Sequence, residues 1–247
     1  MPQRLKLIVA YDGGAFAGWQ SQAHRNTVQD KLEHAFQKIA GVRVRAHGAG
    51  RTDAGVHALA QCAHVDLPNQ RLSAEHWANA LNASLPATIR VLRCQYVSQN
   101  FHARFSATGK LYRYRIWAAP ILPPHELGRA WHISAPLDVD LLRGATKKFV
   151  GTHDFAAFAA SRGEKETDST RTIRSVRVRK TGSCITIEVA GDGFLYKMVR
   201  LMVGAMMRVA QCKMDAKEIA EQLKSGRADT SRVVAPAEGL YLIKVWY

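Results

Sequence analysis

The stretch VRVRAHGAGRTDAGVHALAQCAHVDL, residues 42–67, decides how the first half of the chain folds. It predicts a short strand over 42–46, a glycine-rich loop over 47–57 and a second strand over 57–67. Three glycines, Arg51 and Asp53 fall within the loop. Because glycine frees the backbone and lets a bulky partner approach closely, this loop is the first candidate for a functional site.

The loop has two interpretations when it is taken alone. Arg51 and Asp53 are two residues apart, so in an extended chain their side chains point the same way, and the carboxylate can be held open to a ligand. Alternatively, Asp53 is a turn residue whose carboxylate accepts local backbone N–H groups. The spacing does not decide between them. A phosphate cradle is disfavoured, because the third glycine of G-x-G-x-x-G and the lysine of a P-loop are missing.

The segments around this loop predict a ferredoxin-like α+β unit. Asn26 or Thr27 caps a first helix that Gly41 ends, and Ser73 and Pro86 bound a second helix. The predicted elements before residue 107 are strands over 4–14, 42–46, 57–67 and 89–98, and helices over 26–41 and 73–86. Their order, strand, helix, strands, helix, strand, is that of the ferredoxin-like α+β motif.

The second half has the same α+β character without a clear repeat. Its predicted elements are strands over 109–118 and 239–247, a hairpin over 173–191 that turns at Thr181 and Gly182, and helices over 137–151, 194–211 and 215–226. We therefore expect an α+β protein of two ferredoxin-like domains with antiparallel sheets, residues 1–107 and 108–247, and a cleft between them. Residues 161–170 are expected to form a mobile loop.

The strand TGKLYRYRIW is the second candidate site. Alternation places Lys110, Tyr112, Tyr114 and Ile116 on one face, and arginines among the residues of the other. Aromatic rings interleaved with cations suit base stacking and phosphate contact. The alternative is that the tyrosines are half-buried core residues with solvated hydroxyls. The consensus of an RNA-recognition motif is not matched.

The helix over 194–211 is the third candidate. Its periodicity places Lys197, Gly204 and Arg208 at the centre of a polar face and its methionines toward the core. Arg200 falls at the boundary, from which a long side chain can present its guanidinium in a cleft. The alternative is a surface arginine whose stem lies along apolar residues.

The charge balance points to a polyanionic partner. The chain of 247 residues carries 35 Lys and Arg against 20 Asp and Glu, a formal net charge of +15. The excess is spread along the chain, which favours nucleic acid over basicity kept for solubility. Two classes of function remain to be weighed. One is a non-catalytic RNA-binding protein, and the other is a nucleotide-dependent enzyme built on the glycine-rich loop.

Other sequence features predict a reduced cytoplasmic protein. The four cysteines are far apart and form no C-x-x-C pair, and the histidines are scattered, so no metal site is expected. The apolar run near the N-terminus is too short for a signal peptide. Arg200 and Arg208 interrupt the most apolar later segment, so no membrane span is expected.

Six motifs in register carry a family resemblance. They are YDGGAFAGWQ, GAGRTDAGVHALAQ, FHARFSATGKLYRY, GTHDFAAF, GDGFLYKMVRLMVG and APAEGLYL, in this order from Tyr11 to Leu242. Together they resemble the tRNA pseudouridine synthases of the TruA type over nearly the whole chain.

The resemblance implies a function and a set of site residues. It implies an isomerase that converts uridines 38, 39 and 40 of the tRNA anticodon stem-loop to pseudouridine, as a homodimer that needs neither cofactor nor metal. It assigns Asp53 as the catalytic aspartate and Tyr112 as the ring that stacks on the target base. It assigns Arg200 as the partner of the catalytic carboxylate and Arg51 as a binder of the RNA backbone.

Overall fold

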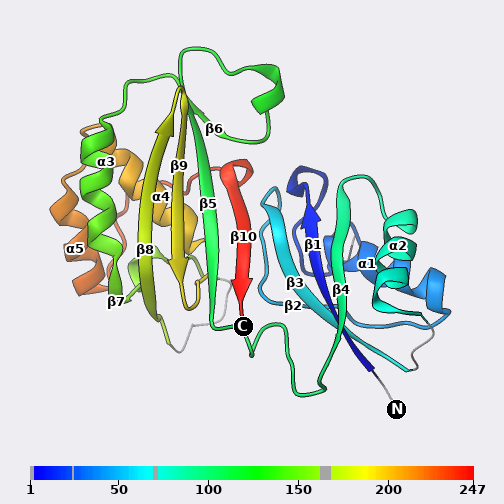
Figure 1. The fold of residues 1–247 in the computed structure, drawn as a ribbon. Coiled ribbons are helices and arrows are strands. Elements are labelled where there is room, and N and C mark those ends of the chain that lie inside the picture. The colour runs from blue at the N-terminus through cyan, green and yellow to red at the C-terminus, as the bar shows by residue number, and fades with distance from the viewer. Residues whose placement is uncertain (1–2, 24, 69–71, 162–167) are drawn as a thin grey trace. The chain divides into compact units, whose positions relative to one another are not determined.

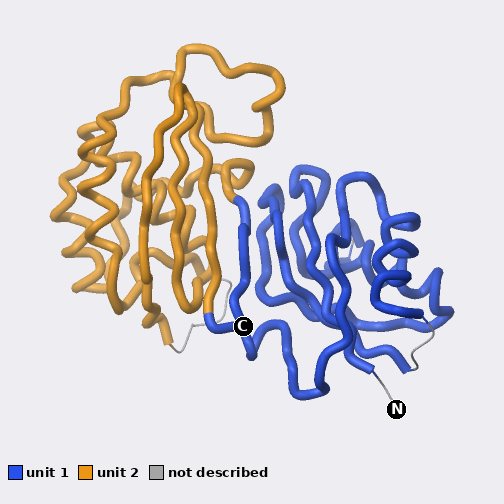
Figure 2. Tube along the Cα trace, viewed as in Figure 1, with its two compact units in different colours: residues 1–108, 241–247 blue, residues 109–240 orange. Residues whose placement is uncertain are grey.

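The chain forms two compact units in the computed structural model, which describes residues 3–23, 25–68, 72–161 and 168–247. Unit 1 comprises residues 1–108 and 241–247, and unit 2 comprises residues 109–240 (Figure 2). The last segment, 241–247, thus belongs with the first unit, although the sequence alone placed it in the second domain. Of the segment 161–170, residues 162–167 lie outside the described residues.

Unit 1 has the strand and helix order of a ferredoxin-like fold. Its elements are β1 (Gln3–Tyr11), η1 (Gly13–Ala15), α1 (Val28–Ala40), β2 (His47–Gly48), β3 (His57–Leu67), α2 (Ala74–Ser84), β4 (Ile89–Val97) and β10 (Leu240–Trp246). Strand β1 lies between β3 and β4 and is antiparallel to both. Strand β2 pairs antiparallel and β10 parallel with β3. Helices α1 and α2 cover one face of this sheet (Figure 1).

Local signals fix the ends of α1, as predicted. The Thr27 hydroxyl accepts the Asp30 N–H, and Gly41 ends the helix in the left-handed conformation at φ 71°. The strand predicted over 42–46 does not form, and pairing with β3 is limited to His47 and Gly48. One reason is visible at Ala46, whose backbone N–H donates to Glu33 Oε1 at 3.0 Å instead of to a neighbouring strand.

Alternating burial along β1 builds the main core of unit 1. Leu5, Leu7 and Val9 are fully buried, as a half-buried strand requires. The Phe36 ring of α1 lies 5.2 Å from the Trp77 ring of α2, centroid to centroid, so the two helices pack on one another through aromatic side chains.

Unit 2 combines a mainly antiparallel sheet with helices on one of its sides (Figure 1). Its elements are β5 (Gly109–Ala118), η2 (Pro124–Glu126), β6 (Trp131–Ile133), α3 (Val139–Thr146), η3 (Lys147–Phe149), β7 (Gly151–Asp154), η4 (Ala156–Phe158), β8 (Thr170–Thr181), β9 (Cys184–Gly191), α4 (Met198–Ala210), α5 (Ala216–Ser225) and η5 (Ala237–Gly239). Strands β5, β9, β8 and β7 are neighbours in this order, and β6 pairs parallel with β5. The predicted α+β class with antiparallel sheets is confirmed.

Helix α4 differs from its prediction in length and in which of its faces is covered. It begins at Met198, not at residue 194, because Lys197 adopts a left-handed conformation at φ 58°. The polar face predicted around Gly204 is wrong. A Cβ at this glycine would lie 1.8 Å from the Val233 carbonyl oxygen, so the chain near residue 233 packs directly on the helix. Periodicity cannot reveal such a cover, because it comes from a segment distant in the sequence.

The second face of the unit 1 sheet, away from α1 and α2, carries a smaller core. Ala49, Cys62 and Ala103 are fully buried in it, and Ile8, Phe101 and Val245 pack against its edge. We call this side the second face of unit 1. It joins the start of the glycine-rich loop, through Ala49, to the turn that follows β4, through Ala103.

His64 is a buried titratable group of this second face. Its Nδ1 accepts the Ala103 N–H at 3.1 Å, and its side chain is 1% exposed. Burial lowers its pKa to about 4, with help from the charge of Arg4 and from the neighbouring His102 and His47, while Asp66 acts in the opposite direction. The imidazole is therefore neutral at pH 7.

This buried imidazole makes stability depend on pH. Because the unfolded chain binds a proton near pH 6.5 and the folded chain only near pH 4, the free energy of unfolding should fall as the pH is lowered through this window. We expect His64→Asn, which keeps an acceptor for Ala103 but cannot titrate, to lose less stability between pH 7 and pH 5. The difference should be on the order of 1–2 kcal/mol in urea titrations. An equal loss of unfolding free energy between pH 7 and pH 5 in parent and variant would contradict the role of His64.

Candidate functional site

The glycine-rich loop of unit 1 holds Asp53 between two anchored neighbours. The Thr52 carbonyl accepts the Trp19 N–H at 3.0 Å, and the Asp53 carbonyl accepts the Val56 N–H at 3.1 Å. The Thr52 hydroxyl lies 2.8 Å from the hydroxyl of Tyr11, whose pKa burial raises to about 12, so that this phenol stays neutral. The backbone around a partly buried Asp53 is thus fixed on both sides.

Two glycines of the segment 11–20 let it lie directly against this loop. A Cβ at Gly13 would lie 2.0 Å from the Val56 carbonyl oxygen, and a Cβ at Gly18 would lie 2.6 Å from that of Thr52. Gly18 also has φ +95°, a conformation that side chains disfavour. The loop therefore owes its position to a close approach that only glycine permits.

Arg51 is exposed and connects the loop to α1 through a row of polar side chains. Its Nε donates to Gln20 Oε1 at 3.2 Å, and Gln20 Nε2 donates to Gln29 Oε1 at 2.8 Å. Gln29 in turn donates to Glu33 Oε1 at 2.7 Å. The sequence analysis missed this row. A signal for it existed, since Gln29 is a polar residue on the buried side of a helix.

His57 ends the loop and is a further residue that the sequence analysis did not single out. Its ring is 3% exposed and stacks on Tyr241 of β10 with 4.5 Å between ring centroids. Its Nδ1 accepts the Gly13 N–H at 3.1 Å and lies 3.2 Å from Asp12 Oδ1. This histidine therefore ties the start of β3 to the segment that supports the loop.

Tyr112 lies in unit 2, on β5, where the predicted alternation is confirmed. Tyr112, Tyr114 and Ile116 are buried, and Arg113 and Arg115 lie on the opposite face. Tyr114 is a core residue whose hydroxyl donates to the Pro236 carbonyl at 2.8 Å, so it does not belong to an interleaved stacking surface.

The Tyr112 ring is 7% exposed and is held from one side. Phe194 meets it edge to face, with 5.0 Å between centroids and 78° between planes. A ring fixed in this way keeps its orientation, which suits an aromatic platform more than a mobile side chain would.

Arg200 projects from the first turn of α4 in unit 2. Its Nε donates to the Ala235 carbonyl at 2.7 Å, and its own carbonyl accepts the Ala235 N–H at 3.1 Å. The Arg200 side chain is partly buried. The site residues predicted from the sequence are therefore divided between the units. Arg51 and Asp53 lie in unit 1, and Tyr112 and Arg200 lie in unit 2.

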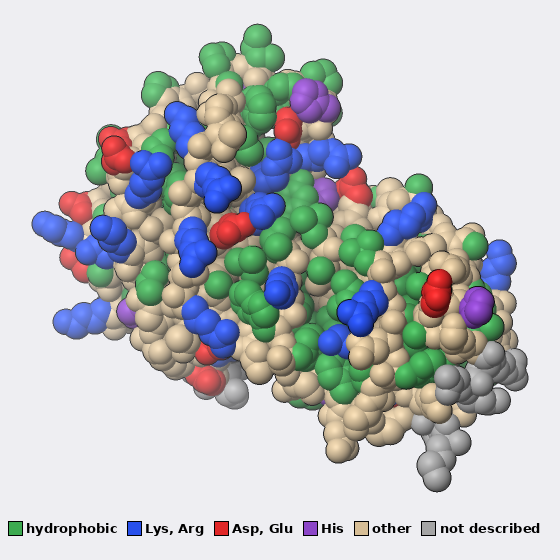
Figure 3. Space-filling model, viewed as in Figure 1, with side chains coloured by type: hydrophobic (Ala, Val, Ile, Leu, Met, Phe, Trp, Pro, Cys, Tyr) green, Lys and Arg blue, Asp and Glu red, His purple; other side chains and the backbone are tan. Residues whose placement is uncertain are grey.

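The open face of the unit 2 sheet is basic. A groove of about 680 Å³ is lined by Arg113, Arg177 and Arg179, with Glu188 bound to Arg113 at 2.7 Å. Figure 3 shows Lys and Arg side chains gathered over strands β5, β8 and β9, which carry these residues. Part of the positive charge that the composition predicts therefore lies on this face of unit 2.

The following observations concern metal ligands, cysteines and membrane-spanning helices. Among the described residues, no group of three or more His, Cys, Asp or Glu is arranged to hold a metal ion. The four cysteines are free. In the same part of the chain, no helix is long and apolar enough to cross a membrane.

Comparison with known proteins identifies the family. The model of the tRNA pseudouridine synthase family matches residues 7–106 and 145–247. The chain belongs to the tRNA pseudouridine synthase family. A protein of Akkermansia muciniphila named tRNA pseudouridine synthase A is 49% identical over 99% of this chain and 95% of its own length. A protein of Acetivibrio thermocellus with the same name is 41% identical over 99% of this chain and its entire length.

Membership of the tRNA pseudouridine synthase family makes this chain an enzyme of the isomerase class, as the resemblance implied. The matched ranges contain Arg51, Asp53 and Arg200, whereas Tyr112 lies between them. The comparison with the two relatives spans 99% of the chain.

The close approach at Gly18 can be tested by adding a single methyl group. Gly18→Ala should lower the free energy of unfolding by about 2–5 kcal/mol, since a left-handed conformation and a backbone clash act together. Gly41→Ala is the matched control, because Gly41 has φ +71° but open space around its Cβ position. It should cost about 1–2 kcal/mol. Urea titration measures both, and equal costs would show that the approach to Thr52 is not tight.

Proposed function

We propose that this chain isomerises uridine to pseudouridine at positions 38, 39 and 40 of the tRNA anticodon stem-loop, with Asp53 as the catalytic residue. Family membership supports the reaction class. The observation that carries the role of Asp53 is its place in a loop whose backbone is anchored at Thr52 and Val56. A carboxylate that must meet one ribose carbon benefits from such a rigid support.

The reaction rearranges bonds within one nucleotide. The N1–C1′ bond breaks, the freed uracil turns, and C5 joins C1′, while C5 loses a proton and N1 gains one. Positive charge develops on the ribose as the first bond loosens. The Asp53 carboxylate either attacks C1′ to form a covalent intermediate or removes the 2′ proton to give a glycal. Both routes need the ionised carboxylate.

The remaining site residues act on the base and on the RNA backbone. Tyr112 offers an aromatic face that keeps the detached uracil from leaving. Arg200 supplies the positive charge that orients the carboxylate of Asp53. Arg51 contacts an RNA phosphate next to the target nucleotide. The target base has to leave its stack before any of these residues can act on it.

The partner and the setting follow from the same proposal. The net charge of +15 suits a polyanion, and the family name specifies tRNA. We propose a homodimer that works in the cytoplasm. A nucleotide-dependent enzyme is disfavoured, because a Cβ at Gly48 would lie 2.5 Å from the Trp19 ring and Ala49 is fully buried, which leaves no open cradle for phosphate.

Asp53→Asn tests the proposed mechanism most directly. The two side chains have nearly the same size, so we expect the melting temperature to change little. Asn can neither attack C1′ nor take the 2′ proton, so tritium release from tRNA labelled at uridine C5 should fall roughly 1,000-fold or more. Binding of tRNA should stay the same or tighten slightly, because one negative charge is removed. A folded variant that releases tritium at the parent rate would remove Asp53 from the mechanism.

Arg200 is proposed as a positioning residue, and two variants separate its charge from its structural contact. Both Arg200→Met and Arg200→Lys lose the Nε–H that donates to Ala235. If the charge orients the carboxylate, turnover should fall roughly 100-fold in the Met variant and less in the Lys variant. If holding Ala235 is the only role, both variants should lose turnover and melting temperature alike, and the proposed pairing with Asp53 would be wrong.

A further inference from the structure

The turn after β4 presents an aromatic side chain on a support made of two imidazoles. Three successive backbone N–H groups donate to them. The N–H of Ala103 donates to His64 Nδ1 at 3.1 Å, and those of Arg104 and Phe105 donate to His102 Nδ1 at 3.1 and 3.3 Å. Both rings thus accept through Nδ1, so each carries its proton on Nε2. Burial lowers the pKa of both His64 and His102, which keeps them in this neutral form.

Further hydrogen bonds close this turn. The Ser106 N–H donates to the His102 carbonyl, and the His102 N–H donates to the Ser106 hydroxyl, both at 2.9 Å. The Tyr247 hydroxyl donates to the Ala103 carbonyl at 2.8 Å. The backbone of residues 102–106 is therefore fixed by side chains from several elements.

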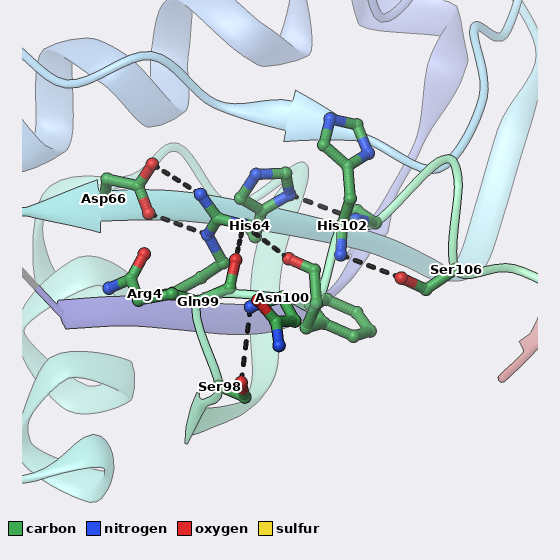
Figure 4. Close-up of polar contacts among 10 residues, drawn as sticks. Arg4, His64, Asp66, Ser98, Gln99, Asn100, His102 and Ser106 are labelled. Carbon is green, nitrogen blue, oxygen red and sulfur yellow. Dashed lines mark hydrogen bonds and ion pairs between the residues drawn. The ribbon is translucent and has the colours of Figure 1, made fainter.

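Arg4 holds the approach to the turn, as Figure 4 shows. Its guanidinium forms two bonds of 2.8 Å to the carboxylate of Asp66 and donates to the carbonyls of Gln99 and Phe101 at 2.6 and 2.7 Å. Such a bidentate pair, anchored to backbone at the same time, resists rotation of the segment that it binds. The support of the turn is thus rigid before any partner arrives.

The rings of this region are in contact in a series that ends in solvent. His47 stacks on His64, His64 meets His102 edge on, and His102 is tilted against Phe105. His47 and His64 lie 5.0 Å apart, His64 and His102 4.7 Å, and His102 and Phe105 4.4 Å, between centroids. Phe105 is 77% exposed, and the Arg104 guanidinium lies 5.6 Å from its centroid. A rigid exposed ring beside a cation is the arrangement that stacks an unpaired base and meets a phosphate.

We propose that Phe105 and Arg104 form a second RNA-contact site, at which an unpaired base of the tRNA stacks on the Phe105 ring. The site rests on the proposed function and lies outside the catalytic loop. Along β3, His57 beside the loop and His64 beside the turn are about 23 Å apart. Ala49 of the loop and Ala103 of the turn share the small core of the second face of unit 1, so one bound RNA can reach both.

A second copy of the chain is the competing occupant for this exposed ring. The local charge disfavours it, since two copies of this surface would bring two exposed Arg104 side chains together. An RNA strand supplies the opposite charge and the π face in one ligand.

The test compares tRNA binding by full-length variants at one salt concentration. Phe105→Leu keeps apolar bulk but removes the π face, and should weaken the Kd for unmodified tRNA roughly 5- to 100-fold. Phe105→Trp should restore it. Ile121→Ala, at an exposed apolar residue of unit 2, is the control and should bind like the parent. KM should rise with Kd in Phe105→Leu, while kcat at saturating tRNA stays unchanged.

The salt dependence separates the ring from the charge. Arg104→Gln should reduce the slope of log Kd against log salt by about one, as for one lost phosphate contact, whereas Phe105→Leu should leave the slope unchanged. A parent protein that neither binds tRNA nor forms pseudouridine would overturn the proposed function itself. A parent that does both, with a Kd unaltered in Phe105→Leu, would overturn only this site. A change of sedimentation in Phe105→Leu without a change in Kd would assign the ring to a second copy.

Discussion

The absence of room for a Cβ between the segment 11–20 and the glycine-rich loop is the constraint on which the site depends. Gly13 and Gly18 face the loop backbone, and Gly48 lies under the Trp19 ring at a distance that would leave a Cβ 2.5 Å from it. Close packing of this kind leaves little room for local motion, so the carboxylate of Asp53 is carried by a fixed backbone. In the proposed mechanism this fixed support keeps reorganisation during the reaction small, which is how a preorganised site lowers an activation barrier.

The second face of unit 1 extends this rigidity by polar means. The buried Ala103 N–H would be costly to leave without an acceptor, and the imidazole of His64 provides one. The imidazole of His102 accepts the N–H groups of the exposed residues Arg104 and Phe105. An imidazole can do so only while it is neutral, and burial favours the neutral form by lowering the pKa of both rings, that of His64 to about 4. The lowered pKa values are thus a consequence of the structural role of these rings. They are not a sign of acid–base catalysis at the second face.

Local sequence signals predicted the elements whose ends are set locally. The Thr27 cap and Gly41 fix α1, and β3 spans the predicted residues 57–67. Three features depend on distant residues and could not be predicted. Glu33 takes the Ala46 N–H where a strand was expected, Val233 covers Gly204 on α4, and β10 returns to pair with β3. A period along the chain carries no information about which remote segment will cover a face.

The candidate site also combines features that the local sequence predicts with features that depend on distant residues. Asp53 could be singled out from its loop, but the spacing left a turn residue and a reactive carboxylate equally open, and only the resemblance carried by the six motifs favours the reactive carboxylate. The polar row from Arg51 to Glu33 belongs to no such motif, because its members come from three separate segments of the chain. It matters physically because it ends in α1, so a residue proposed to bind RNA is braced by a helix of the core. A phosphate that binds Arg51 would meet a guanidinium already oriented by Gln20, which lowers the entropy cost of the contact.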